Sequence, residues 1–554
     1  MVFELLLSFL WLVSFAGHVW FWIGMRRLPA ACAPLAAMGI LTLWMYAGAM
    51  AGGLLVCAWL ALAAGVWLFV RMLCQRSRAL LKGELLLFVL GCLALWLRYR
   101  NALLVAYDDF SHWGMIVRHM LAHNRLPGAG DALITFQSYP PGAACWLYYA
   151  CRFLGGSDGM MLAAQAALTL AGWLPLFALV RGRMRPVKAL SAAAVTLVGL
   201  SLFQGTASLM VDNLLAALAV GTLCLMVKEC RCPWLVGMLA AVLALVKDSG
   251  LFFAAVVIMA YAVLTIKGSD KKAWFRQLTG LCLPAVLSRG VWLAHITWAF
   301  PSATVSRHAL TIENLRATGA DKSYADMFAI GKKLMMQVAS LNNQAVQILV
   351  LMLVLAVAVF VLRGIQTRRW RLGPETVVWA ACAATYLVWL VFLWLMYVFS
   401  MTLSNAQQLV AFERYNSTCA LFLYGVLVMW VLTLDVQTSP RAAACMALTA
   451  VLPLAFGAWS SGFERLIKEN YFVPLRAQMQ ALYEQRPPAE GEEAVVIVSA
   501  EEDSVYADYM ARYTFQLPGV EAKADASGEA WQVYYIAGGE EPELPEGAQI
   551  VRLP

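Results

Sequence analysis

Two adjacent carboxylates, Asp108 and Asp109, lie in the segment with the clearest potential for chemistry, YDDFSHW at 107–113. The segment directly follows an apolar stretch at 84–105 that is long enough to cross a membrane. Because two carboxylates at such a boundary repel each other and are partly desolvated, the pKa of one should rise, which suits a general base near neutral pH. The alternative is that both residues only cap the helix that follows, since Asp is favoured at a helix N-terminus.

A short amphipathic helix is expected next, at 114–123. A helix with one apolar and one basic face lies in the plane of the membrane interface. The segment FQSYPPG at 136–142, which contains Tyr139, then leads into a second short apolar stretch at 143–154. This stretch has no room to cross the membrane, so we expect it to be re-entrant or interfacial.

Other charged residues lie at the ends of apolar stretches. Asp212 begins the stretch at 213–227, where it is either a helix cap or a second acidic site residue. Lys247 and Asp248 lie between two apolar runs, where they either close a tight turn as an ion pair or serve a site. Charged groups close to the hydrocarbon are costly and usually functional.

Two arginines have a similar choice of roles. Arg289 lies in the middle of an apolar stretch and must face a polar cavity or a partner. A lone structural ion pair is the alternative to a site role. Arg414 is followed by Tyr415 at the head of another stretch. A guanidinium in this position suits an anionic headgroup or a pyrophosphate, and an interfacial anchor is the alternative.

His112, His119 and His123 raise the question of a metal site, because the last two share one helical face. Interfacial histidines beside basic residues are usually only solvated, so these three residues do not establish a metal site. The spacing leaves open whether a divalent cation is needed.

The elements that position these residues belong to a membrane protein. Of the 554 residues 62% are apolar and 13% are charged, whereas a soluble protein is roughly a quarter charged. This composition excludes a water-soluble enzyme and a disordered or collagen-like chain. The basic residues occur in short clusters between apolar runs, which is typical of membrane topology and not of nucleic-acid binding.

Fourteen apolar stretches are predicted to form membrane-spanning helices. Basic clusters fall in every second loop and hold 21 of the 34 Lys and Arg residues before position 464, which assigns those loops to the cytoplasm. An even number of spans places both termini outside, in a multi-pass plasma-membrane protein. The predicted spans are 4–24, 29–49, 52–71, 84–105, 159–180, 187–203, 213–227, 234–246, 250–266, 277–297, 344–362, 376–399, 418–434 and 442–459.

The external side receives the long loops at 98–158 and 298–343 and an acidic tail. From residue 464 onward the chain has 17 acidic and 7 basic residues. The tail, taken as 460–554, is predicted to be a small α/β domain, with strands at 494–499 and 531–537 and a helix at 504–513, packed on the external loops. Neither strand is followed by a glycine-rich phosphate loop, so we expect no nucleotide site there.

The acidic pair, the amphipathic helix, the Pro-Pro turn and the second interfacial helix together resemble the first external loop of GT-C glycosyltransferases. The closest likeness is to the bacterial aminoarabinose-transferase and protein O-mannosyltransferase branch. Asp108 and Asp109 stand where that branch has Asp-Glu, and Tyr139 stands where it has Lys before Pro-Pro. The resemblance implies three extra spans at 1–83, a GT-C core at 84–459 and a bacterial plasma-membrane location.

The resemblance also implies a reaction. A sugar would pass from a polyprenyl-phosphate-linked donor to a glycan, lipid or protein acceptor on the external face. Asp109 or Asp108 would accept the proton of the acceptor hydroxyl, so Asp109→Asn should abolish transfer. Lys247, Arg289 and Arg414 would bind the donor phosphate.

His112, Tyr139, Asp212 and Asp248 would support the acceptor site. Relatives differ in whether they use a divalent cation. Two other functions remain open: a flippase of lipid-linked glycans, and a polysaccharide polymerase or ligase. The polymerase or ligase would use Arg307, His308 and Arg316 of the second long loop.

Overall fold

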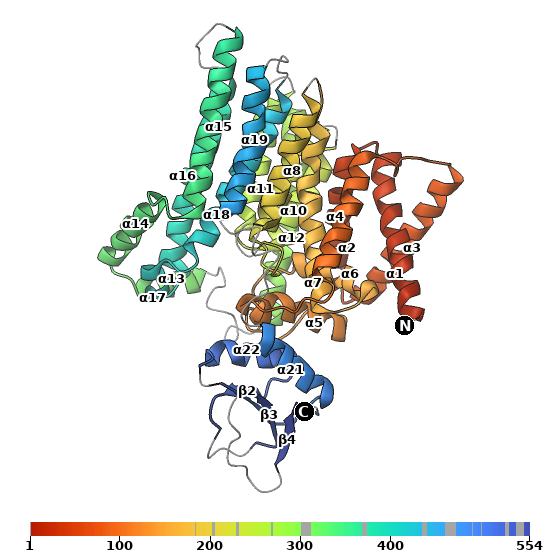
Figure 1. The fold of residues 1–554 in the computed structure, drawn as a ribbon, viewed down its shortest axis with the longest axis vertical. Helices are drawn as coiled ribbons and strands as arrows, with labels where there is room; N and C mark the ends of the chain where they lie inside the picture. Colours follow the sequence, from red (N-terminus) through yellow and green to blue (C-terminus); the bar gives the residue numbers. More distant parts are fainter. Residues whose placement is uncertain are drawn as a thin grey trace.

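The computed structural model shows a bundle of long helices with a small α/β unit attached at one end (Figure 1). The N-terminal residues lie toward the same end of the bundle as this unit. The structure describes residues 2–182, 184–201, 205–228, 232–266, 270–300, 312–367, 374–434, 440–459, 473–489, 491–499, 501–526, 531–538 and 548–553.

Each of the fourteen stretches predicted to span the membrane is helical. Within the described residues, seven helices are long and apolar enough to cross a membrane, and five further apolar helices are shorter. The protein is therefore membrane-embedded, and the count of fourteen crossings stays a prediction. The fourteen helices are α1 (Val2–Trp20), α2 (Ala33–Met50), α3 (Leu54–Cys74), α4 (Gly83–Tyr99), α7 (Asp158–Trp173), α8 (Arg185–Ser201), α9 (Asp212–Lys228), α10 (Pro233–Val246), α11 (Gly250–Ile266), α12 (Lys271–Ala299), α15 (Gln344–Thr367), α16 (Pro374–Phe399), α18 (Phe412–Thr433) and α19 (Pro440–Trp459).

Several of the short helices lie toward the end of the bundle nearest the α/β unit (Figure 1). Helices are present at both positions predicted to be interfacial, as α5 and α6, and their placement relative to the membrane stays a prediction. The short elements are the π-helices η1 (Phe21–Met25) and η3 (Asp109–Trp113), the 3-10 helices η2 (Ala30–Cys32) and η4 (Leu174–Leu179), and the α-helices α5 (Gly114–His123), α6 (Gly142–Leu154), α13 (Ile312–Ala320), α14 (Tyr324–Val338) and α17 (Leu403–Gln408).

Two helix ends differ from prediction at the site. Helix α4 ends at Tyr99 and not at 105, so the chain is free to turn before it reaches the acidic pair. Helix α18 begins at Phe412 and not at 418, which places Glu413 and Arg414 in its first turn. The first turn of α18 is stabilised because Arg414 pairs with Asp108 and Asp212, partners that apolar length alone does not predict.

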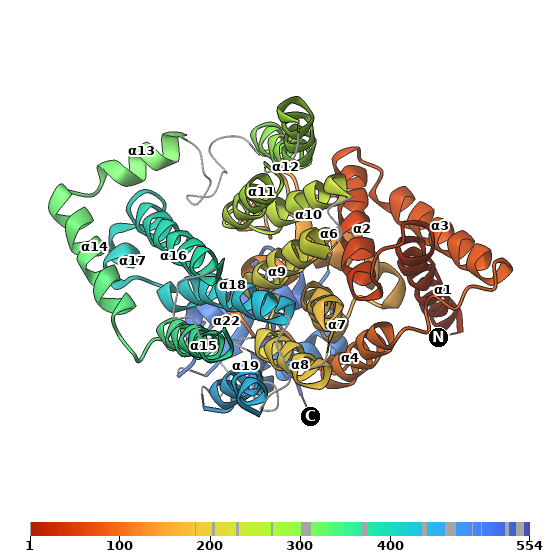
Figure 2. The ribbon, with the colours of Figure 1, turned by 90° about the horizontal axis from the view of Figure 1, so that it is seen from above.

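Small residues allow close helix packing around the site helices. A Cβ on Gly221 of α9 would lie 2.3 Å from the carbonyl oxygen of Gly172 in α7, and one on Gly172 would lie 2.7 Å from the backbone of Ala217. Such contacts are typical of helices that associate within a membrane. Seen along the bundle, α9 lies between α7, α10 and α18, so the start of α9 is held from three sides (Figure 2).

The C-terminal unit contains a four-stranded parallel sheet of order β2-β1-β3-β4. The two predicted strands and the predicted helix are present as β1, β3 and α22, whereas the short edge strands β2 and β4 were not predicted. Every residue of β1 is buried, which explains why its apolar run was recognisable. The elements are α21 (Val473–Gln485), β1 (Ala494–Val498), α22 (Ser504–Phe515), β2 (Val520–Lys523), β3 (Val533–Ala537) and β4 (Gln549–Arg552).

Candidate active site

Four charged side chains from distant parts of the chain form one ion-pair network. Arg414 Nη1 donates to Asp108 Oδ2 at 2.6 Å, and Arg414 Nε lies 3.7 Å from Asp212 Oδ2. Lys247 Nζ donates to Asp212 Oδ1 at 2.8 Å. The network alternates two carboxylates with two cations, so each charge is compensated by a neighbour.

Each member of the network comes from a different element end. Asp108 directly precedes η3, Asp212 is the first residue of α9, Lys247 follows the last residue of α10, and Arg414 is the third residue of α18. Asp212 also accepts a 3.5 Å hydrogen bond from Thr418, one turn after Arg414. The spacing of helix ends in the bundle therefore brings together four residues that the sequence separates widely.

A second ion pair lies next to the network in the chain, because Asp248 directly follows Lys247. Asp248 forms an ion pair with Arg289 of α12, and the Arg289 side chain is 9% exposed. Of the two roles that the sequence left open for Arg289, the structure shows the ion pair, because Asp248 in the turn before α11 is its partner. Arg289 therefore acts on its surroundings through Asp248.

A cavity of about 640 Å³ opens beside these pairs. Its polar wall includes Lys247 and Asp248, and Tyr415 receives Lys247 over its ring at 4.9 Å from the centroid. The rest of the wall is mostly apolar and comes largely from α16. The lining residues are Tyr139, Lys247, Asp248, Ser249, Leu315, Arg316, Gly319, Ala320, Trp389, Phe392, Leu393, Leu395, Met396, Phe399, Ser400, Met401 and Tyr415.

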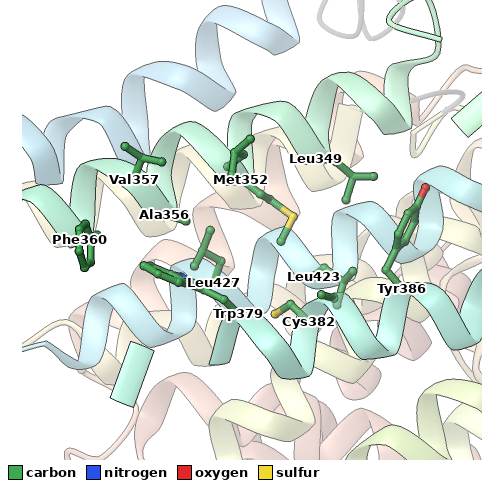
Figure 3. Close-up of a pocket in the computed structure, with 12 residues that line it drawn as sticks. Leu349, Met352, Ala356, Val357, Phe360, Trp379, Cys382, Tyr386, Leu423 and Leu427 are labelled. Atoms are coloured by element: carbon green, nitrogen blue, oxygen red, sulfur yellow. The ribbon is translucent and has the colours of Figure 1, made fainter. Parts of the chain in front are cut away.

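A second cavity, of about 620 Å³, lies between α15, α16 and α18 (Figure 3). Its walls are apolar, with Trp379 and Tyr386 of α16 facing Met352 of α15. Residues 379–386 of α16 line this cavity and residues 389–401 line the first or its rim. The two cavities therefore follow one another along the same helix.

The two aspartates of the pair have different environments. Asp108 has a side chain that is 32% exposed, and it makes no capping hydrogen bond to η3. Asp109 is fully buried, where its Oδ1 accepts hydrogen bonds from Leu209 N at 3.0 Å and from Ser208 Oγ at 3.1 Å. Burial raises the pKa of Asp109 well above its usual range. The helix-capping alternative therefore fails for Asp108, and Asp109 instead holds the loop that leads into Asp212.

His112 and Tyr139 belong to an aromatic cluster behind the cavity. The two rings meet edge to face at 4.9 Å, and Trp113 and Phe136 complete the cluster. Only Tyr139 of these residues lines the cavity. Neither ring nitrogen of His112 has a hydrogen-bond partner within the described chain, and burial lowers its pKa to about 3.

Replacing His112 by Phe is expected to reduce the loss of stability in acid. A histidine whose pKa is lower in the folded than in the unfolded state takes up a proton on unfolding, so the folded state loses stability as the pH falls from about 6.5 towards 3. Thermal unfolding in nanodiscs between pH 7 and pH 4 measures the slope of stability against pH. The exposed His123→Phe is the control and should leave it unchanged; an unchanged slope in His112→Phe would contradict the burial argument.

The described residues beside the cavity are not arranged to fit a divalent cation. Among the described residues, no group of three or more His, Cys, Asp or Glu side chains is arranged to hold a metal. The three carboxylates beside the cavity are each paired with a Lys or Arg, which provides the charge that a cation would supply. His119 lies 3.8 Å from Asp131, and Arg125 already holds that carboxylate at 2.7 Å.

From the sequence, Tyr415 was named only as the neighbour of Arg414 and Arg316 only for the polymerase or ligase alternative, and Asp158 was given no role. Tyr415 lies against both Lys247 and Arg414, and Arg316 lines the cavity from the second long loop. Asp158, at the start of α7, is a buried carboxylate that contacts Arg118, Arg476 and Tyr513. An acidic residue at the start of an apolar stretch, as also occurs at Asp212, was the available signal for Asp158. Arg307 and His308 of that loop lie outside the described residues.

Comparison with known proteins gives structural likeness at low identity. No protein-family model and no curated protein matches the chain. The structure is similar to the archaeal oligosaccharyltransferase AglB from Archaeoglobus fulgidus, solved with an inhibitory peptide and a dolichol-phosphate, with 11% identity over 80% of this chain and a TM-score of 0.41. The chain spans 64% of the length of that protein.

The structure is also similar to ArnT from Cupriavidus metallidurans in the apo state and bound to undecaprenyl phosphate. The identity is 14%, the matches cover 81% of this chain and 86% of ArnT, and the TM-scores are 0.37 and 0.36. AglB and ArnT are both GT-C glycosyltransferases, the superfamily that the first external loop of this chain resembles.

Proposed function

We propose that this protein is a membrane glycosyltransferase that uses a polyprenyl-phosphate-linked sugar and transfers it to an acceptor hydroxyl on the external face. The observation that carries the proposal is the network of Asp108, Arg414, Asp212 and Lys247 beside a cavity whose other walls are mostly apolar. Such a site offers a base, cations for a phosphate and a surface for a lipid. The GT-C resemblance of the first external loop agrees with this reading.

In this mechanism Asp108 is the general base. Its carboxylate takes the proton from the acceptor hydroxyl, whose oxygen then bonds to the anomeric carbon of the sugar. The bond between that carbon and the phosphate oxygen breaks, and the electron pair leaves with the polyprenyl phosphate. Lys247 and Arg414 stabilise the charge that develops on the phosphate, and Arg289 supports them by holding Asp248.

The lipid chain has a route along α16. The cavity beside the ion pairs would take the phosphate and the first isoprene units, and the apolar cavity of Figure 3 would take later ones. An isoprenoid gains free energy by leaving water for such walls, at about 25 cal/mol per Å² of buried apolar surface. This route explains why the site lies at the end of an apolar helix pair.

The proposal is tested by transfer from a defined donor. The protein in nanodiscs is supplied with an undecaprenyl-phosphate-linked sugar and candidate acceptors, and the release of undecaprenyl phosphate is followed by mass spectrometry. We expect release from this donor and none from a nucleotide sugar, because a donor with an isoprenoid chain fits the apolar walls. Translocation of the intact donor across vesicles without cleavage would overturn the proposal in favour of a flippase.

A further inference from the structure

The basic residues around the cavity differ in whether they are paired with a carboxylate. Lys247 and Arg414 share Asp212 and Asp108, and Arg289 is paired with Asp248. Three aspartates therefore balance three cations, and these six side chains provide no net positive charge. The positive charges of this network are therefore already neutralised by the aspartates. They can orient a phosphate in the cavity, but they attract it only weakly.

Arg316 lines the same cavity and has no such partner. It lies on α13, in the second long loop, and no ion pair joins it to the part of the chain that the structure describes. The side chain is exposed and therefore remains solvated until a ligand enters. With Arg316 the cavity wall has one positive charge in excess.

The position of Arg316 depends on how closely α13 approaches α16. Gly319, one turn further along α13, lines the cavity and is buried against Phe399 at the end of α16. A Cβ at Gly319 would lie 2.7 Å from the Phe399 ring. The absence of a side chain there allows α13 to lie against α16, which brings Arg316 to the wall of the cavity that Lys247 and Asp248 also line.

We propose that Arg316 is the residue that attracts and binds the phosphate of the lipid donor, an inference that rests on the proposed function. An unpaired guanidinium can form two parallel hydrogen bonds to phosphate oxygens without breaking an existing ion pair. Lys247 and Arg414, by contrast, must weaken their bonds to Asp212 and Asp108 before they can contact a phosphate fully. The second long loop thereby provides part of the donor site.

The experiment measures the preference for a phosphate headgroup. Binding of undecaprenyl phosphate and of undecaprenol, which lacks the phosphate, is compared by native mass spectrometry in the wild type, Arg316→Gln and Arg316→Lys. Lys332→Gln is the matched control, because it removes an exposed cation from α14 of the same loop without touching the cavity. Thermal unfolding of each variant checks that α13 and its neighbours stay folded.

We expect Arg316→Gln to weaken undecaprenyl phosphate binding by about tenfold to a hundredfold, as the loss of a charged hydrogen-bond donor predicts, and to leave undecaprenol binding unchanged. Arg316→Lys should recover part of the affinity, and Lys332→Gln should match the wild type. If Arg316→Gln keeps the wild-type preference for phosphate, the inference is wrong and the proposed function stands. If the wild type itself shows no preference for phosphate over undecaprenol, the proposed function fails first.

Discussion

Replacing Asp108 by Asn should reduce sugar transfer by about a hundredfold to ten-thousandfold, which is the usual contribution of a general base. The substitution keeps the size of the side chain and removes its ability to accept a proton. It also removes the charge that Arg414 holds at 2.6 Å, so Arg414 would pair more fully with Asp212. The measurement is the kcat for release of undecaprenyl phosphate from a saturating donor, with expression and thermal unfolding as controls for folding.

The neighbouring substitution Asp109→Asn is the matched control and should reduce transfer by less than about tenfold, because an Asn oxygen still accepts the hydrogen bonds from Leu209 and Ser208. The sequence had favoured the opposite result, namely loss of transfer in Asp109→Asn. The complete burial of Asp109 is the reason for moving the base to Asp108. An active Asp108→Asn variant beside an inactive Asp109→Asn variant would return the base to Asp109.

The positions of the long helices could be predicted from sequence because each depends on a local property. A run of about twenty apolar residues is helical in a membrane whatever its neighbours are. For the same reason Asp108, Asp212, Lys247 and Arg414 could be predicted to lie at one end of the bundle, since each follows or precedes such a run. Asp108, Asp212, Lys247 and Arg414 therefore form one network, and Asp109 and His112 are buried.

The partners of these residues could not be predicted in the same way. Nothing near Asp108 in the sequence indicates that Arg414, 306 positions away, will hold it. Arg316 lies in a polar loop whose approach to α16 depends on Gly319, and the edge strand β4 is too short to show a pattern. Pairing across the chain depends on how helix ends meet in space, which single-sequence periodicity does not contain.

The C-terminal unit is joined to the site by one buried carboxylate, Asp158. Its Oδ1 accepts from Arg118 at 2.8 Å and from Tyr513 at 2.7 Å, and its Oδ2 accepts from Arg476 at 3.1 Å. Arg118 lies in α5, directly after η3, whereas Arg476 and Tyr513 lie in α21 and α22. Asp158 therefore connects the acidic tail to the segment that carries Asp108 and Asp109.

Aromatic contacts strengthen this junction. Tyr509 of α22 meets Tyr107 at 4.8 Å, and Tyr513 meets Phe110 at 5.2 Å, so the rings on both sides of Asp108 and Asp109 pack against the tail. Tyr506, from the same helix, donates to the carbonyl oxygen of Val105. The tail thus supports the loop that positions the proposed base.

Replacing Asp158 by Asn should destabilise the protein by about 3–5 kcal/mol, because it leaves the buried guanidinium of Arg476 and the partly buried one of Arg118 without their counter-charge. The Arg476 side chain is fully buried and the Arg118 side chain is 21% exposed, so neither charge can be fully solvated in place. Tyr513→Phe removes only the hydroxyl that donates to Asp158 and should cost about 1 kcal/mol. Thermal and denaturant unfolding in nanodiscs measure both effects.

Asp131→Asn is the matched control, since it breaks an ion pair of the same loop whose Arg125 side chain is 49% exposed, and it should cost less than about 1 kcal/mol. Hydrogen exchange then locates the damage: in Asp158→Asn, protection should fall in both α5 and α22, because the two helices share this carboxylate. Unchanged protection in α5 together with a wild-type unfolding midpoint would mean that the tail does not support the loop that carries Asp108. In that case transfer should also survive removal of the Asp158 charge, which separates the role of the tail from that of Asp108.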